Sequence, residues 1–186
     1  MAITPSDLEL IELVKDGELD YYEDLITRYR RVVFNFAYLK LNEPSVAEDV
    51  SQETFLKAYR SLAKYNPEYK FVTWLLAICN NVCINHFNQE KKKLIYLRQK
   101  ALEDGIPPSR PNAFELLDTT DYVRSIIKDL EREDRLLLLL RFWQELSHNE
   151  ISEIMDMPSG TVRSKLCRLL KRLRENLNRT KEREIK

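Results

Sequence analysis

The chain has 186 residues, 44% of them hydrophobic and 32% charged, so it can bury one medium core or two small ones. Few glycines and abundant Leu, Glu, Lys and Arg predict an all-α protein. No apolar run approaches the roughly 20 residues of a membrane span, and an odd number of cysteines does not suggest a secreted disulfide scaffold. The N-terminus does not have the pattern of a signal peptide, so we expect a cytoplasmic protein. The charges of the 30 basic and 30 acidic residues cancel, but residues 1–24 carry a net charge of −7 and residues 158–186 a net charge of +7. This distribution indicates that only part of the chain faces a polyanion. The alternative is that both regions are solvated helix faces.

Two helical domains joined by a linker are predicted along the chain. Residues 5–90 contain successive helices, with breaks at residues 41–44 and 65–68. Residues 91–121 begin with three consecutive lysines and later contain a glycine and three prolines, which disfavour a continuous helix. Beyond about residue 122 the helical pattern returns, with a core run of five leucines at Leu136 to Leu140. We therefore expect a first domain over 1–93, a flexible linker over 94–121 and a second domain over 122–186.

The helix that begins near Ser45 has two different sides. Helical spacing places Ala47, Phe55, Ala58 and Leu62 on the buried side. The opposite side carries Asp49, Gln52, Glu53, Leu56 and Arg60. A leucine among acidic residues on an outer face favours a surface that docks a partner, and solvated charge is the alternative interpretation.

The next segment, residues 65–93, interleaves aromatic, amide and basic side chains. Aromatic rings can stack on unpaired bases, amides can hydrogen-bond base edges and lysines can follow the backbone, so the segment is typical of single-stranded nucleic-acid binding. The candidate residues are Asn66, Lys70, Phe71, Asn81, Asn85, Lys91 and Lys92. The alternative is that the aromatic and aliphatic residues form a helical core, which we expect for Trp74 and Leu75.

A helix-turn-helix is predicted over residues 146–178. Ser147 and Glu150 have the spacing of a capping box, so a helix should begin at His148 and stop in the turn at residues 156–160, where Ser159 or a neighbour is the expected N-cap. In the second helix an apolar stripe comprises Val162, Leu166, Leu169, Leu173 and Leu177, and a basic arc lies opposite. Early residues of such a helix reach base edges and later ones contact phosphates. The candidate DNA-binding residues are Thr161, Arg163, Ser164, Lys165, Arg168, Lys171 and Arg172.

Together the two halves resemble the extracytoplasmic-function (ECF) group of the sigma-70 family, from about residue 8 to residue 178. In the first half the resemblance rests on the sequences at residues 49–55 (DVSQETF) and 71–75 (FVTWL). In the second half it rests on residues 150–154 (EISEI) and 160–165 (GTVRSK). One departure is Ser152, which stands where the family usually has a small apolar residue.

The resemblance implies a non-catalytic subunit that directs RNA polymerase to promoters. The first half would be region 2, whose helix with Asp49, Gln52, Glu53 and Leu56 docks on the clamp helices of the polymerase largest subunit, and whose segment at 66–93 opens and reads the −10 element. The second half would be region 4, which contacts the polymerase flap and reads the −35 element. The expected partners are core RNA polymerase, promoter DNA and an anti-sigma factor; no cofactor, metal or membrane insertion is expected.

Two other functions and one other site are compatible with parts of the sequence. A free-standing helix-turn-helix regulator would leave the Asp49 helix without a role, and a helical adaptor protein would not need the basic face. Cys79, Cys83 and His86 share helical spacing, but they lack a fourth ligand and the C-x-x-C pattern of zinc sites, so we interpret them as helix packing. No motif for catalysis is present.

Overall fold

The computed structural model describes residues 5–101 and 130–184, and their side chains over 5–90 and 130–175. Every regular element in these two ranges is helical. The chain divides into two compact units, residues 1–115 and residues 116–186. Each unit is described by itself.

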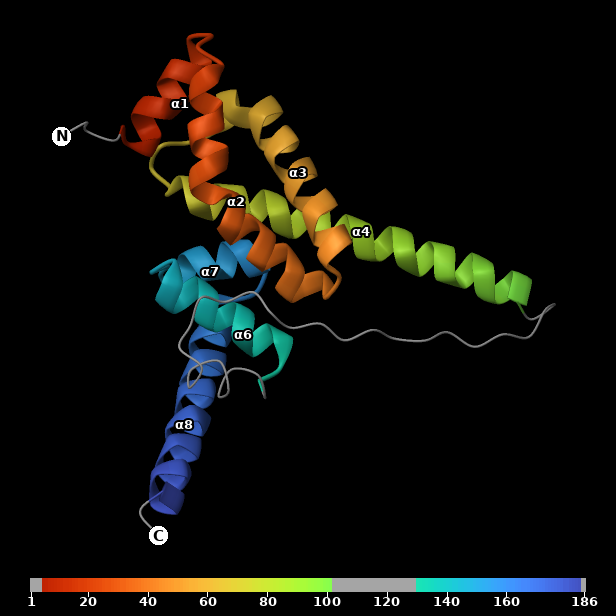
Figure 1. Ribbon diagram of the computed structural model, residues 1–186, viewed down its shortest axis with the longest axis vertical. Helices are drawn as coiled ribbons and strands as arrows, with labels where there is room; N and C mark the ends of the chain where they lie inside the picture. The colour runs from red at the N-terminus through yellow and green to blue at the C-terminus, as the bar shows by residue number, and fades with distance from the viewer. Residues whose placement is uncertain (1–4, 102–129, 185–186) are drawn as a thin grey trace. The chain divides into compact units, whose positions relative to one another are not determined.

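Within residues 5–101, the described part of the first unit, four α-helices form a bundle (Figure 1). They are α1 (Asp7–Lys15), α2 (Asp20–Leu41), α3 (Pro44–Ser61) and α4 (Phe71–Ala101), with a 3₁₀ turn η1 (Leu62–Lys64) after α3. Helix α2 packs against the other three, and α3 also packs against α4. The turn between α2 and α3 is closed by Asn42 in the left-handed conformation, followed by Pro44 at the first position of α3.

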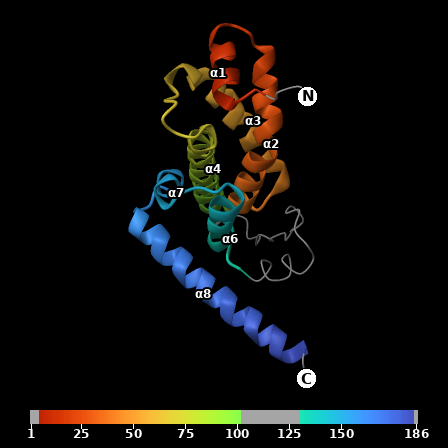
Figure 2. The same cartoon turned by 90° about the vertical axis from the view of Figure 1, so that its left-hand side faces the viewer.

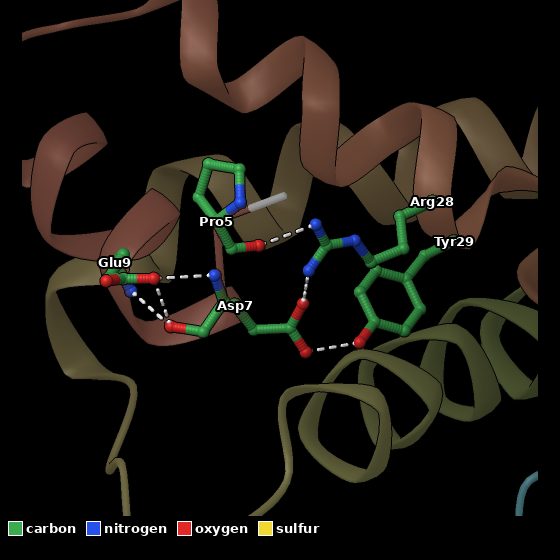
Figure 3. Close-up of polar contacts among 6 residues, drawn as sticks. Pro5, Asp7, Glu9, Arg28 and Tyr29 are labelled. Atoms are coloured by element: carbon green, nitrogen blue, oxygen red, sulfur yellow. Dashed lines mark hydrogen bonds and ion pairs between the residues drawn. The ribbon is translucent and has the colours of Figure 1, made fainter. Parts of the chain in front are cut away.

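The start of α1 is fixed by local hydrogen bonds. Ser6 and Glu9 form a capping box, in which the Ser6 N–H donates to Glu9 Oε2 at 2.7 Å. These bonds lower the pKa of the Glu9 carboxyl. The Asp7 carboxylate accepts hydrogen bonds from Arg28 and from the Tyr29 hydroxyl (Figure 3). Helix α1 is therefore held to α2 by polar contacts as well as by its buried apolar residues.

Over its described residues, 130–184, the second unit contains three α-helices and one π-helical turn (Figure 2). They are α6 (Arg132–Leu138), the π-helical turn η2 (Leu139–Trp143), α7 (His148–Met155) and α8 (Ser159–Glu184). Leu136 to Leu140 are all buried, so the predicted leucine core is confirmed. Helix α8 packs against both α6 and α7.

The end of α4 differs from the one predicted. Helix α4 continues to Ala101, past its predicted end near residue 90, because none of residues 91–101 is a glycine or proline that would stop it. The glycine and prolines of the predicted linker lie outside the described residues. Among the described residues, no helix is long and apolar enough to cross a bilayer.

Candidate partner-docking and nucleic-acid-binding surfaces

Helix α3 has the two sides predicted from its sequence. Ala47, Phe55 and Ala58 are buried, and Leu62 is buried just after the helix. The residues predicted for the opposite side are all exposed: Asp49, Gln52, Glu53, Leu56 and Arg60. The Leu56 side chain is 58% exposed, and Glu53 forms an i,i+4 ion pair with Lys57 at 2.7 Å. We call Asp49, Gln52, Glu53 and Leu56 the α3 docking surface.

A groove of about 450 Å³ lies beside this surface, between α2 and α3. Gln52 belongs to both, so the groove and the α3 docking surface are continuous. Phe34 and Phe55 contribute to its apolar lining, and Arg30 and Glu48 place opposite charges on its α2 and α3 walls. Such a groove can accept apolar side chains of a partner helix while its walls pair with polar ones.

The loop before α4 is ordered by its own hydrogen bonds. Asn66 Oδ1 accepts from the Glu68 N–H at 3.0 Å, which is an Asx turn, and the Tyr65 hydroxyl donates to the Tyr69 carbonyl at 2.5 Å. Asn66 and Lys70 are exposed. The loop thus holds the exposed Asn66 and Lys70 side chains on a fixed backbone, and the Asn66 amide is bonded to Glu68 through both its oxygen and its nitrogen.

Phe71, proposed from the sequence to contact nucleic acid, is a core residue here. Its side chain is 2% exposed and packs edge-on against Tyr29 and Tyr65, with ring centroids 5.4 and 5.6 Å apart, and lies 5.6 Å from the Trp74 ring. It cannot stack on a base in this conformation. Because Asp7 holds Tyr29 (Figure 3), α1 supports the aromatic cluster at the start of α4.

The asparagines of α4 fall into two groups. Asn80 is buried and accepts a hydrogen bond from Lys40, so it belongs to the polar part of the core. Asn81 and Asn85 are exposed, as a nucleic-acid contact requires. Asn88 is also exposed and follows them at i+7 and i+3, so it lies on the same side of the helix. Helical spacing could have identified Asn88, and the sequence analysis missed it. The side chains of Lys91 and Lys92 lie outside the described residues.

Cys79 and Cys83 are both buried against the bundle core, which agrees with their interpretation as packing residues. A hydrogen bond between the two thiols raises the pKa of Cys79 and lowers that of Cys83. Within the described parts of the chain, no three His, Cys, Asp or Glu side chains are arranged to hold a metal ion.

The helix-turn-helix has the predicted capping box, and α7 ends within the predicted turn. The Ser147 N–H donates to Glu150 Oε2 at 2.7 Å, and α7 begins at His148. The left-handed residue of the turn is Asp156, with φ 51°, whereas Gly160 already lies in α8. The Pro158 carbonyl accepts the first bonds of α8, so Pro158 occupies the N-cap position that we expected Ser159 or a neighbour to fill.

Ser152 and Ser159 both stabilise this turn. The Ser152 hydroxyl donates to the Met157 carbonyl at 2.6 Å, so the hydroxyl that departs from the family pattern has a bonding partner. The Ser159 hydroxyl donates to Asn149 Oδ1 at 2.8 Å, which links the starts of the two helices. The angle between α7 and α8 is therefore set by side-chain hydrogen bonds at both ends of the turn.

Helix α8 presents a basic surface opposite its apolar stripe. Val162, Leu166 and Leu169 are buried, as predicted. The exposed residues among the candidates are Thr161, Arg163, Ser164, Arg168, Lys171 and Arg172. Lys165 is half-buried and forms an ion pair with Glu133, and Arg172 forms one with Asp134, both in the first turn of α6. Of the seven candidates, Lys165 and Arg172 thus form ion pairs with α6, and the other five face solvent.

Both units match known protein families. The family model Sigma-70 region 2 matches residues 25–93, and the family model Sigma-70, region 4 matches residues 120–173. Together the two matches cover well over half of the chain.

Whole-chain relatives agree with these matches. The chain is 28% identical over 178 residues to the ECF RNA polymerase sigma factor SigW of Bacillus subtilis, covering 90% of this chain and 94% of the relative. It is 31% identical over 181 residues to the ECF RNA polymerase sigma-E factor of Haemophilus influenzae, covering 90% and 93%. Its fold is similar to that of the sigma factor RpoE of Bartonella quintana, solved in complex with the anti-sigma factor NepR, with a TM-score of 0.58, 21% identity and coverage of 84% and 96%.

Proposed function

The chain belongs to the ECF group of the sigma-70 family, and from this premise we propose which of its surfaces bind core RNA polymerase and which bind promoter DNA. As a sigma factor it directs promoter-specific initiation of transcription by RNA polymerase. The observation that carries this function is the presence of both regions in one chain, in the order region 2 and then region 4. A free-standing helix-turn-helix regulator would account for the second unit alone.

The α3 docking surface is proposed to bind the clamp helices of the polymerase largest subunit. Its support is an exposed leucine surrounded by Asp49, Gln52 and Glu53, next to a groove that can receive apolar side chains. The exposed Leu56 and the adjoining groove together form an apolar area on the surface, which favours a partner, and the polar residues around it are available for pairing.

The exposed residues of the loop and of α4 are proposed to bind the −10 element as it opens. Asn66, Lys70, Asn81 and Asn85 supply the amide and ammonium groups, and Lys91 and Lys92 follow them along the same helix. Asn88 joins this set, and Phe71 leaves it because its ring is buried. We assign Phe71 to supporting the loop instead of stacking on a base.

The basic surface of α8 is proposed to bind the −35 element, and the second unit also to contact the polymerase flap. The domain limits proposed from the sequence are 1–93 and 122–186, and α4 continues through residues 94–101 of the linker proposed between them. We further propose that the protein is non-catalytic, acts in the cytoplasm and is held inactive by an anti-sigma factor, as the likeness to an anti-sigma-bound sigma factor suggests.

Reconstituted transcription tests the function. Purified chain added to core RNA polymerase on a library of genomic fragments should produce discrete start sites, each preceded by shared −35 and −10 sequences. Core polymerase alone should produce none of them. Start sites that are the same with and without the chain would overturn the assignment.

A further inference from the structure

Two acidic residues at the start of α6 form ion pairs with two bases of α8. Glu133 Oε1 pairs with Lys165 Nζ, and Asp134 Oδ2 pairs with Arg172 Nη2. Lys165 and Arg172 are seven residues apart, so they lie on the same side of α8, toward α6. The side chain of Asp134 is 19% exposed and that of Arg172 is 50% exposed, so the acid is more buried than the base with which it pairs.

The contacts belong to a larger polar hollow between the two helices. The hollow has a volume of about 310 Å³ and is lined by acidic residues of α6 and basic residues of α8. Its charged lining consists of Glu131, Glu133, Asp134, Lys165, Arg168 and Arg172. Acidic residues in a first turn stabilise a helix by themselves through its dipole. That effect explains why α6 begins with acids, but it does not explain why two bases of α8 face them.

We propose that Glu133 and Asp134 compete with DNA phosphates for Lys165 and Arg172, and so limit how many cations of α8 bind the DNA backbone. The inference rests on the proposed binding of the −35 element by α8. Both ion pairs are only partly buried, so water and salt still screen them and a phosphate can replace the carboxylate. Phosphate contacts raise affinity for every DNA sequence alike. The two acids therefore lower sequence-independent binding and leave base contacts, such as those of Arg163, unaffected.

The test is a salt series of promoter binding by the full chain assembled with core polymerase. The double variant Glu133→Gln, Asp134→Asn should bind all −35 variants several-fold more tightly, and its slope of log K against log salt should steepen by about one to two units, one for each phosphate gained. Discrimination among −35 variants should not increase. An unchanged slope, or a weaker affinity, would overturn the proposal.

Glu131→Gln is the matched control for long-range charge. Glu131 lines the same hollow, makes no capping hydrogen bond through its side chain and loses the same single charge. Its slope should stay close to that of the wild type. The single variant Glu133→Gln is measured beside it. If the two single variants changed the slope of log K against log salt equally, net charge, and not the ion pair, would set the affinity.

A double-mutant cycle tests the Asp134–Arg172 contact directly. Arg172→Ala should weaken DNA binding more in the Asp134→Asn background than in the wild type, because Arg172 reaches the phosphate only when it is released. Equal losses in both backgrounds would contradict competition. Lys171→Ala separates the two proposals: if it is silent as well, binding of DNA by α8 fails, and if it weakens binding while the acid variants are silent, only the competition fails.

Discussion

Replacing Asp49, Gln52 and Glu53 together by alanine should weaken binding to core RNA polymerase on the order of 100-fold, or about 2.7 kcal/mol, while leaving the helix content unchanged. The three side chains are exposed, so their removal opens no cavity in the bundle. The lost Glu53–Lys57 pair is worth about 0.3–0.5 kcal/mol, which the higher helix propensity of alanine offsets. The measurement is titration of labelled chain with core polymerase, together with far-ultraviolet circular dichroism.

A matched control separates the docking contacts from net charge. Glu18→Ala with Asp24→Ala removes the same two negative charges from exposed positions outside α3. This variant should bind core polymerase as the wild type does. Wild-type affinity in the triple variant, or an equal loss in the control, would remove the support for the α3 docking surface.

Arg163→Ala should cost about 1–3 kcal/mol in −35 recognition and relax the preference at particular base pairs. Arg163 is exposed and lies one turn from the start of α8, the part of a recognition helix that enters the major groove. Reconstituted transcription on templates with single-base changes in the −35 element measures the effect. The preference should relax at the contacted positions and persist at the others.

Lys171→Ala provides the contrast, because Lys171 is also exposed but lies two turns further along α8. Its loss should weaken all −35 variants alike and reduce the salt slope by about one unit, as expected for one phosphate contact. Lys165 and Arg172 are less suitable for this comparison because α6 holds them. If Arg163→Ala and Lys171→Ala gave the same uniform loss, α8 would be an electrostatic anchor that does not read sequence.

Features that depend on neighbouring residues in the sequence were predictable. The Ser147 capping box, the buried stripe of α8 and the exposed side of α3 follow from spacing alone, since each depends on residues within a few turns of one helix. The resemblance to a known family then gave the order of the two regions, which the family models match.

Features that depend on contacts between distant residues were not predictable. The burial of Phe71 requires Tyr29, which lies 42 positions earlier in the sequence, and a hydrophobic pattern on α4 alone does not reveal that partner. The pairing of Arg172 with Asp134 joins residues 38 positions apart, so the basic arc of α8 looked uniform in the sequence. The conformation of the turn was also not predicted: Asp156 adopts the left-handed conformation that glycine adopts most readily.

Promoter binding by the chain alone and with core polymerase tests the central assignment most directly. At physiological salt the chain alone should bind promoter DNA no more tightly than non-specific sequences, at roughly 10⁻⁶ M or weaker. With core polymerase it should bind its promoters at about 10⁻⁸ M or tighter and protect both the −35 and the −10 elements. Tight, sequence-specific binding by the chain alone that core polymerase does not change would contradict a sigma factor and identify a free-standing regulator.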